Sequence, residues 1–379
     1  MASPNVPFVL LILVLFASLY THNSKDRLRP LFFPILVLLY FYIVIYTSTS
    51  VPATNYNIGL QSFLLLLLAS DYLLLTPSLQ HTLIRRGSLS PPKSSNEQFA
   101  WALDLITNPR GVNWSFEAPR LRRSSLPRWA FVRSQLLWAF VFYIFKDVLF
   151  IHLSRNPAFD PDGVGMRAGG WLWRIWNVWA FWMTFASEMS LYSTLLGVSC
   201  VVSGLWEPQD CPFFFGHWTE AVSVRAFWGR TWHQVLRHTL TTHGRYFANT
   251  ILHLPRGSLL STYTQLVVVF FLSGIFHSSA EWVLSHNPQF AFDAVAFYTL
   301  QALAIMVEDG VAAIGKRIGV RDTFAVKLFG MAWLALWMAW SGPLWMDPMI
   351  KGRMLATMGP SASVVERFLG AFNSFEFAR

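Results

Sequence analysis

Long apolar stretches alternate with polar, basic loops along this chain of 379 residues. Eight stretches approach the length of about 20 apolar residues with which an α-helix crosses the hydrocarbon core of a bilayer. They lie at 6–20, 31–47, 58–75, 131–151, 175–205, 263–283, 292–313 and 327–345. The pattern predicts an all-α fold, a polytopic transmembrane helical bundle of about eight spans, because a lone span can satisfy its backbone in lipid only as a helix.

The first and fifth stretches allow more than one interpretation. Residues 6–20 follow no basic segment and end at no small-residue cleavage site, so a retained helix is favoured over a signal peptide. Residues 175–205 are longer than one span requires and contain Glu188. They are compatible with one tilted helix or with two segments, one of them re-entrant.

Composition places the chain in the same class. Hydrophobic residues make up 54% of the sequence and charged residues 13%, with 18 Trp and 33 Phe. A soluble domain is less apolar, less aromatic and more highly charged. The two cysteines, Cys200 and Cys211, are too few for a disulfide framework or a cysteine metal site.

Basic residues are distributed unevenly between alternate loops. Of the 29 Lys and Arg residues, 19 fall in the loops at 21–30, 76–130, 206–262 and 314–326, and 7 in those at 152–174 and 346–379. Lys and Arg favour the cytoplasmic side, so the richer loops are predicted to be cytoplasmic and both termini lumenal, provided that the fifth stretch crosses once. The net charge of +9 then reflects loops beside anionic lipid, and no nucleic-acid partner is expected.

Four regions follow from this topology. They are an N-terminal region of three spans at 1–75, a basic cytoplasmic loop at 76–130, the remaining spans at 131–345 and a C-terminal tail at 346–379. Within the third region, the aromatic-rich segment 206–262 is expected to be partly embedded at the cytoplasmic face. The basic run at 121–128 is interpreted as an ordinary cytoplasmic flank, with a grip on anionic headgroups or a phosphate-bearing ligand as the alternative.

The most informative polar residue inside a span is His277. If its helix enters the membrane near residue 263, the histidine lies about 20 Å along it at 1.5 Å per residue. An ionisable group at that depth is costly, and a short side chain cannot reach the interface, so a functional role is favoured over tight packing with a hydrogen bond. Imidazole can take a proton from a hydroxyl and return it elsewhere near neutral pH.

A second segment, Ser223–Gln234, is both polar and aromatic. Helical spacing would place Trp228 and Trp232 together at i and i+4, with Arg230, His233 and Gln234 turned elsewhere. This describes an amphipathic helix at the membrane interface. Two interpretations stay open at this point. The residues anchor the helix at the interface, or Arg230 and His233 line a cytosolic mouth through which an anionic acyl donor enters.

Other charged residues in the spans carry weaker signals. Glu308 and Asp309 stand side by side near the cytoplasmic end of the seventh span, where one of them could orient His277 or fix a helix end. Lys146 and Asp147 are interpreted as a structural, mutually neutralising arrangement.

No metal and no resident cofactor is expected. The sequence lacks a P-loop, a Gly-x-Ser-x-Gly elbow and the paired histidine motifs of membrane di-iron hydroxylases. His233, His238 and His243 recur every five residues, which spreads them around a helix. His277 and Glu281 stand at i and i+4 and could ligate together, but no second pair accompanies them.

Taken in order, the motifs resemble those of the wax-synthase branch of the membrane-bound O-acyltransferase superfamily. Ser223–Gln234 resembles the signature of that branch, and Asp210–Ala221 resembles the Cys-Pro block that precedes it. His277 in Ser-Gly-Ile-Phe-His resembles the superfamily's intramembrane histidine, while 108–114 and 307–309 resemble blocks of fungal members. Thr231 departs from a more frequent basic residue and Phe213 from a frequent second proline.

The resemblance implies transfer of an acyl group from acyl-CoA, most simply acetyl-CoA, to a hydroxyl of a hydrophobic alcohol. The fungal style of the motifs implies a terpenoid or meroterpenoid of secondary metabolism as the acceptor. In that reaction His277 would act as the general base, and His233 would orient or polarise a reactant. The other residues that the resemblance assigns to substrate binding are Arg225, Trp228, Arg230, Trp232, Gln234 and Glu308; the two arginines would meet the CoA phosphates.

The expected partners are acyl-CoA, the alcohol and the lipid bilayer, and the expected location is the endoplasmic reticulum or another endomembrane. One alternative in the same class is a wax-ester synthase that uses long-chain alcohols. Outside the class, a transporter predicts inverted repeats, which the sequence does not display. A membrane terpenoid cyclase predicts that central acids such as Glu308 matter more than His277.

Overall fold

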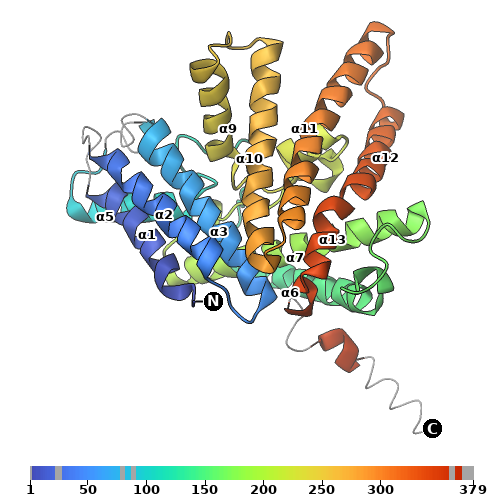
Figure 1. Ribbon diagram of the computed structural model, residues 1–379, viewed down its shortest axis with the longest axis horizontal. Helices are drawn as coiled ribbons and strands as arrows, with labels where there is room; N and C mark the ends of the chain where they lie inside the picture. The colour runs from blue at the N-terminus through green and yellow to red at the C-terminus, as the bar shows by residue number, and fades with distance from the viewer. Residues whose placement is uncertain (1, 22–27, 77–81, 87–90, 358–362, 369–379) are drawn as a thin grey trace. The chain divides into compact units, whose positions relative to one another are not determined.

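The computed structural model describes residues 2–21, 28–76, 82–86, 91–357 and 363–368. Within these ranges the chain is helical and contains no β-strand beyond two isolated bridges, as the apolar pattern predicts (Figure 1). Parts of the predicted loop at 76–130 and of the tail at 346–379 lie outside the described residues.

Among the described residues, seven helices are long and apolar enough to cross a membrane. They are α2 with the short helix before it (Arg29–Tyr46), α3 with a terminal π-turn (Pro52–Leu75), α6 (Arg128–Arg155), α7 (Trp171–Ser203), α10 (Leu259–Ser285), α11 (Pro288–Arg317) and α12 (Phe324–Ser341). The remaining predicted span, α1 (Asn5–Tyr20), is an apolar helix of 16 residues, about 24 Å long and shorter than the hydrocarbon core. The protein is an integral, multi-pass membrane protein.

The fifth apolar stretch forms a single helix. α7 runs for 33 residues from Trp171 to Ser203, about 50 Å at 1.5 Å per residue. Gly204 ends it in the left-handed conformation with φ 79°. The interpretation as one long helix is therefore confirmed, and the alternative with two segments is wrong.

The described helices belong to two compact units. The first comprises residues 1–119 and 234–320, and the second comprises 120–233 and 321–379. Besides the helices already given, the first unit contains α5 (Ser95–Thr107) and α9 (Arg237–Arg245), and the second contains α8 (Val224–Ala226) and α13 (Pro343–Lys351). In the first unit α10 packs against α3, α9 and α11 (Figure 1), and in the second α7 packs against α6 and α12.

Two glycines let the helices of the first unit approach α10 closely. A Cβ atom on Gly59 of α3 would lie 2.5 Å from the carbonyl oxygen of Ser279. A Cβ atom on Gly274 of α10 would lie 2.8 Å from the Cα atom of Val295 in α11. Small residues at helix contacts are a common device in membranes, because they bring backbones together where no hydrophobic effect drives the association. α3 and α11 are thereby held against two sides of the same stretch of α10.

The second unit gives partners to three charged residues of α6 and α7. The Lys146 ammonium of α6 lies 3.0 Å from the Glu188 carboxylate of α7, and both side chains are largely buried. Asp147 is fully buried and accepts hydrogen bonds from the backbone N–H groups of Val364 and Val365, at 2.9 and 3.1 Å. The prediction that Lys146 and Asp147 neutralise one another is wrong in its pairing, because adjacent residues on a helix point in different directions.

Candidate active site

His277 stands near the end of α10 that the charge pattern predicts to be lumenal. It follows the first residue of the helix, Leu259, by 18 positions and precedes the last, Ser285, by 8. The hydroxyl of Tyr56, on α3, lies 3.2 Å from Nδ1 of the imidazole. The ring of Tyr298, on α11, stacks on the imidazole with 4.4 Å between centroids and 6° between planes.

The helix contacts explain how the two tyrosines reach the histidine. Tyr56 precedes Gly59 by three positions on α3, so both lie on the same side of that helix. Gly274 precedes His277 by three positions on α10, and Val295 precedes Tyr298 by three on α11. Each glycine contact is therefore about one helical turn from a tyrosine–imidazole contact.

A second buried tyrosine binds the same helix without touching the imidazole. The Tyr40 hydroxyl, on α2, donates to Oγ of Ser279 at 3.0 Å. The Ser279 hydroxyl in turn donates to the carbonyl oxygen of Gly59 at 3.0 Å. These two hydrogen bonds satisfy the Ser279 hydroxyl and the Gly59 carbonyl at the close contact between α3 and α10. Glu281, one turn beyond His277, is fully buried.

The acidic residues predicted to assist His277 lie elsewhere on α11. Glu308 is 10 positions beyond Tyr298, which is about 15 Å along the helix. Asp309 accepts a hydrogen bond from the Tyr263 hydroxyl at 3.2 Å. The prediction that one of the two acids could orient His277 is wrong on this geometry, and Asp309 instead ties α11 to the beginning of α10.

The predicted amphipathic helix over Ser223–Gln234 does not form. The Ser223 hydroxyl caps the short helix α8, a π-turn spans Phe227–Thr231, and Trp232 is extended. The rings of Trp228 and Trp232 do lie close, with 6.2 Å between centroids. The π-turn followed by an extended residue produces this contact, and not the i, i+4 spacing of a helix.

The aromatic residues of this segment are packed inside the protein. Trp232 lies edge-on to Trp182 of α7 with 4.5 Å between centroids, and Phe227 is fully buried beside them. The interpretation of the tryptophans as interfacial anchors is therefore wrong for Trp232. Arg225 and Arg230, in contrast, are exposed.

His233 follows this aromatic cluster directly. Its imidazole is half-buried, with the rings of Phe214, Phe215 and Trp232 between 5.3 and 6.1 Å away. The boundary between the two compact units falls after His233, so that Gln234 belongs to the first unit. Gln234 accepts a hydrogen bond from Arg237 at 2.8 Å.

Gly216 joins the Cys-Pro block to the signature segment. A Cβ atom here would overlap the carbonyl oxygen of Arg230, and the Gly216 N–H donates to the carbonyl oxygen of Thr231 at 2.9 Å. Thr231 is fully buried, and its hydroxyl donates to the carbonyl oxygen of His217 at 3.2 Å. The two motifs, separate in the sequence, therefore form one structural element.

The basic run at 121–128 packs on the same block. The Arg122 guanidinium lies 4.8 Å from the centroid of the Phe213 ring, and Arg123 donates to the carbonyl oxygen of Gln209 at 2.7 Å. These contacts give two of the arginines a structural role within the protein.

Comparison of the sequence with known proteins points to one family. The sequence model of the "Membrane bound O-acyl transferase family" matches residues 211–300, a range that includes the signature segment and His277. "Acetyltransferase ple2" of Rhodocybe pseudopiperita is 31% identical over 96% of this chain and 95% of its own length. The chain belongs to the membrane-bound O-acyltransferase family.

Two other relatives extend the likeness within this O-acyltransferase family. "Acetyltransferase eriL" of Hericium erinaceus is 29% identical over 90% of both chains. "Acetyltransferase sirH" of Leptosphaeria maculans is 27% identical over 74% of this chain and 71% of the relative. The resemblance inferred from the motifs is confirmed, and the protein is a membrane O-acetyltransferase that uses acyl-CoA and an acceptor substrate.

The buried Thr231 and the stacked Phe213 are the two departures from the motifs of the O-acyltransferase family. Each has a structural partner: Thr231 hydrogen-bonds to His217, and Phe213 supports Arg122. Neither departure removes a predicted catalytic group.

The helix that follows the signature, α9, fastens the end of α3. Nε2 of His243 lies 2.7 Å from the Ser70 hydroxyl, and Nε2 of His238 lies 3.4 Å from the buried Asp71 carboxylate. Burial, followed by the nearby Arg245 and His243, lowers the pKa of His238 to about 4. His238 is therefore neutral at physiological pH, and its contact with Asp71 is not an ion pair.

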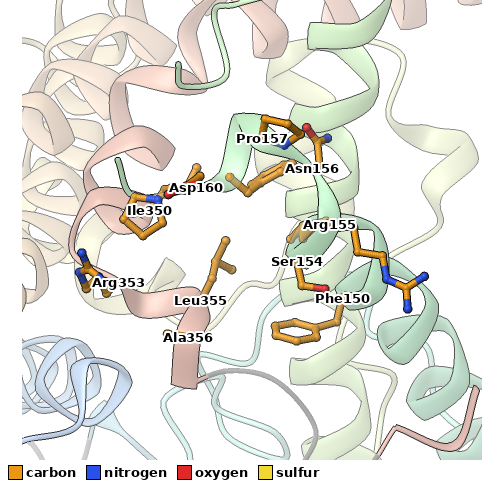
Figure 2. A pocket seen from close by; sticks show the side chains of 13 residues that line it. Phe150, Ser154, Arg155, Asn156, Pro157, Asp160, Ile350, Arg353, Leu355 and Ala356 are labelled. Atoms are coloured by element: carbon orange, nitrogen blue, oxygen red, sulfur yellow. The ribbon is translucent and has the colours of Figure 1, made fainter. Parts of the chain in front are cut away.

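A cavity of about 420 Å³ lies in the second unit. Figure 2 shows side chains from the end of α6, such as Phe150 and Arg155, opposite Ile350 of α13 and Leu355 of the turn that follows. None of the residues assigned to catalysis or substrate binding lines it.

Proposed function

We propose that this O-acetyltransferase moves the acetyl group of acetyl-CoA to a hydroxyl of a hydrophobic alcohol, a terpenoid or meroterpenoid of fungal secondary metabolism. The motif resemblance supports the acceptor class, and the names of the relatives support the acetyl group. An apolar acceptor dissolves in the bilayer, so it can approach a spanning helix directly. The soluble thioester arrives from the cytosol.

In the proposed mechanism His277 is the general base. Its imidazole takes the hydroxyl proton of the alcohol while the alcohol oxygen attacks the thioester carbonyl carbon. A tetrahedral intermediate forms, and its oxyanion needs a hydrogen-bond donor. The C–S bond then breaks, and the CoA thiolate takes the proton from the imidazolium. The products are the acetate ester and CoA with a free thiol, and no proton is gained or lost overall.

The observation that carries this proposal is the setting of His277 within α10. The imidazole is half-buried in a spanning helix, beside the Tyr56 hydroxyl and stacked on Tyr298. A histidine that served only to fill space would be an expensive choice at that depth. A general base, in contrast, needs a fixed ring and surroundings from which water is excluded.

Residues of the signature segment are proposed to bind the donor. Arg225 and Arg230 are exposed cations that can bind CoA phosphates through charge-assisted hydrogen bonds. His233 is proposed to orient or polarise a reactant. The remaining assignments, Trp228, Trp232, Gln234 and Glu308, rest on the resemblance alone. The endoplasmic reticulum or another endomembrane is the proposed location.

Acetyl transfer is tested with microsomes that contain the protein, radiolabelled acetyl-CoA and a panel of hydroxylated terpenoids and long-chain alcohols. We expect a labelled terpenoid ester from the native protein and a loss of about 100- to 10,000-fold in His277→Ala, the contribution typical of a general base. The matched control is His253→Asn, which changes an exposed histidine with a φ of 52° in the same unit, because asparagine tolerates that backbone.

Other results would identify the alternatives. Ester formed only from long-chain alcohols would indicate a wax-ester synthase. Ester formation that survives His277→Ala but is lost in Glu308→Gln would move the role of general base from His277 to Glu308. Failure to bind acetyl-CoA by a correctly folded protein would reject the proposed donor.

A further inference from the structure

The contact between α3 and α10 assigns a role to a residue outside all the family motifs. Tyr56 lies in the first turns of α3, is 3% exposed, and its hydroxyl is 3.2 Å from Nδ1 of His277. The two residues are 221 positions apart in the sequence. Their contact depends on Gly59, because a larger residue there would push α3 away from Ser279.

We propose that Tyr56 is a positioning residue that determines which nitrogen of His277 acts as the base. This inference rests on the proposed function. A neutral imidazole carries one proton, and the second nitrogen accepts. If Nδ1–H donates to the phenol oxygen of Tyr56, the lone pair resides on Nε2, and Nε2 takes the proton of the alcohol.

The phenol also supports the charged form of the ring. Once Nε2 has taken the proton, Nδ1–H remains bonded to the Tyr56 oxygen, so the imidazolium keeps a hydrogen-bond partner on that side. Such bonds strengthen when one partner becomes charged. A partner that binds the charged state better than the neutral state lowers the barrier to proton transfer and leaves substrate binding unaffected.

Tyr298 supplies the second constraint. Its ring is 2% exposed and stacks on the imidazole almost in parallel. The stacking fixes the plane of the imidazole, and the hydrogen bond from Nδ1 fixes its rotation within that plane. Together the two contacts hold the ring in one orientation, which is the preorganisation that a general base requires.

The chain provides a close control for Tyr56. Tyr40 is also a buried tyrosine, 7% exposed, whose hydroxyl binds α10 at 3.0 Å. Its partner is Ser279, two positions beyond His277. Tyr40→Phe and Tyr56→Phe therefore each remove one buried hydroxyl that binds α10, but only the second change removes a partner of the imidazole.

The experiment measures kcat, KM for acetyl-CoA and thermal stability for His277→Ala, Tyr56→Phe and Tyr40→Phe. We expect Tyr56→Phe to lower kcat by about 10- to 100-fold, as is typical when the partner that orients a reactive imidazole is removed. KM should stay within about twofold, because kcat falls alone when an interaction made only in the transition state is lost. Tyr40→Phe should lose about as much thermal stability as Tyr56→Phe but keep a nearly native kcat.

Each contrary result has a distinct meaning. If His277→Ala is inactive but Tyr56→Phe and Tyr40→Phe have the same kcat, the positioning role is rejected and the proposed function stands. If His277→Ala remains active, acetyl transfer stands but His277 is not its general base, and the role of Tyr56 fails with that assignment. Should Tyr56→Phe not fold, 4-fluorophenylalanine at position 56 keeps nearly the volume of tyrosine and removes the hydrogen bond. The same fall in kcat is then expected for that variant.

Discussion

The two units hold polar side chains inside spanning helices in different ways. In the second unit, the cation of Lys146 faces the anion of Glu188 across 3.0 Å, and the charges cancel. In the first unit, the His277 imidazole contacts the Tyr56 hydroxyl and the Tyr298 ring, which are both neutral. An ion pair resists any change in the charge of one member. A neutral hydrogen-bonded group can accept a proton and release it. The surroundings of His277 in the first unit therefore suit chemistry, and the ion pair of the second unit suits structure.

The largest effect is expected from breaking the ion pair. Lys146→Met leaves the Glu188 carboxylate without its partner, which should cost about 3–5 kcal/mol of stability. The double variant Lys146→Met/Glu188→Leu removes both charges and should recover most of that loss. Thermal or denaturant unfolding in detergent measures the stability of the single and the double variant. Equal stability of the single and double variants would show that an unpaired Glu188 carboxylate costs no stability, which contradicts this prediction.

The neutral polar contacts of the first unit should make it sensitive to acid. The pKa of His238 is about 4 in the folded protein, below the usual value near 6.5 of an unfolded chain. The unfolded state therefore binds a proton first as the pH falls, and stability is fully present above about pH 6.5 and declines toward pH 4, by about 2–3 kcal/mol.

Unfolding between pH 7 and pH 4.5 measures this decline, with His238→Gln as the control. Glutamine does not titrate in this range, so the variant should lose less stability than the native protein. An identical decline in both proteins would assign the acid sensitivity to another group, such as His243, whose pKa burial also lowers.

The close helix contacts of the first unit give the next prediction. Gly59→Ala places a Cβ atom 2.5 Å from the Ser279 oxygen and 2.7 Å from the Ala280 Cα atom, which should cost about 1–3 kcal/mol as overpacking does. It also moves Tyr56 away from His277, so activity should fall. Gly310→Ala is the control, since no atom lies within 4 Å of that position. Equal activity in the two variants would contradict a role for the α3–α10 contact in catalysis.

The smallest effect is expected at the exposed arginines of the second unit. Arg230→Ala should raise KM for acetyl-CoA about 5- to 10-fold at unchanged kcat, since exposed charge contacts contribute modestly. Added salt should reduce the difference. Arg256→Ala, at another exposed loop arginine, serves as the control. A KM for acetyl-CoA that is equal in both variants would remove Arg230 from the donor site.

The apolar pattern predicted most of the fold, because span length and helical backbone bonding are imposed by the bilayer. His277 was found from its depth alone. Tyr56 and Tyr298 were missed, because a tyrosine in an apolar run is common and its importance depends on which helices lie beside α10. Gly59 and Gly274 were the available signal that other helices approach α10 closely. Glycines are frequent in spans, however, and have several uses there.

Signals that depend on local geometry were less reliable. The spacing of Trp228 and Trp232 predicted a helix, but a π-turn and an extended residue bring the rings together. The backbone of this segment is fixed by Gly216, more than ten positions earlier in the chain. Periodicity cannot detect such a contact, because it describes only neighbours along one helix.

The burial of Asp147 has a consequence for the order in which the protein is made. Its two backbone partners, at 364 and 365, leave the ribosome 217 and 218 residues later, a delay of roughly ten to forty seconds at typical translation rates. During that interval α6 must enter the membrane with a carboxylate that its final partners cannot yet satisfy. The second unit therefore reaches its finished state only after residues 364 and 365 have been made.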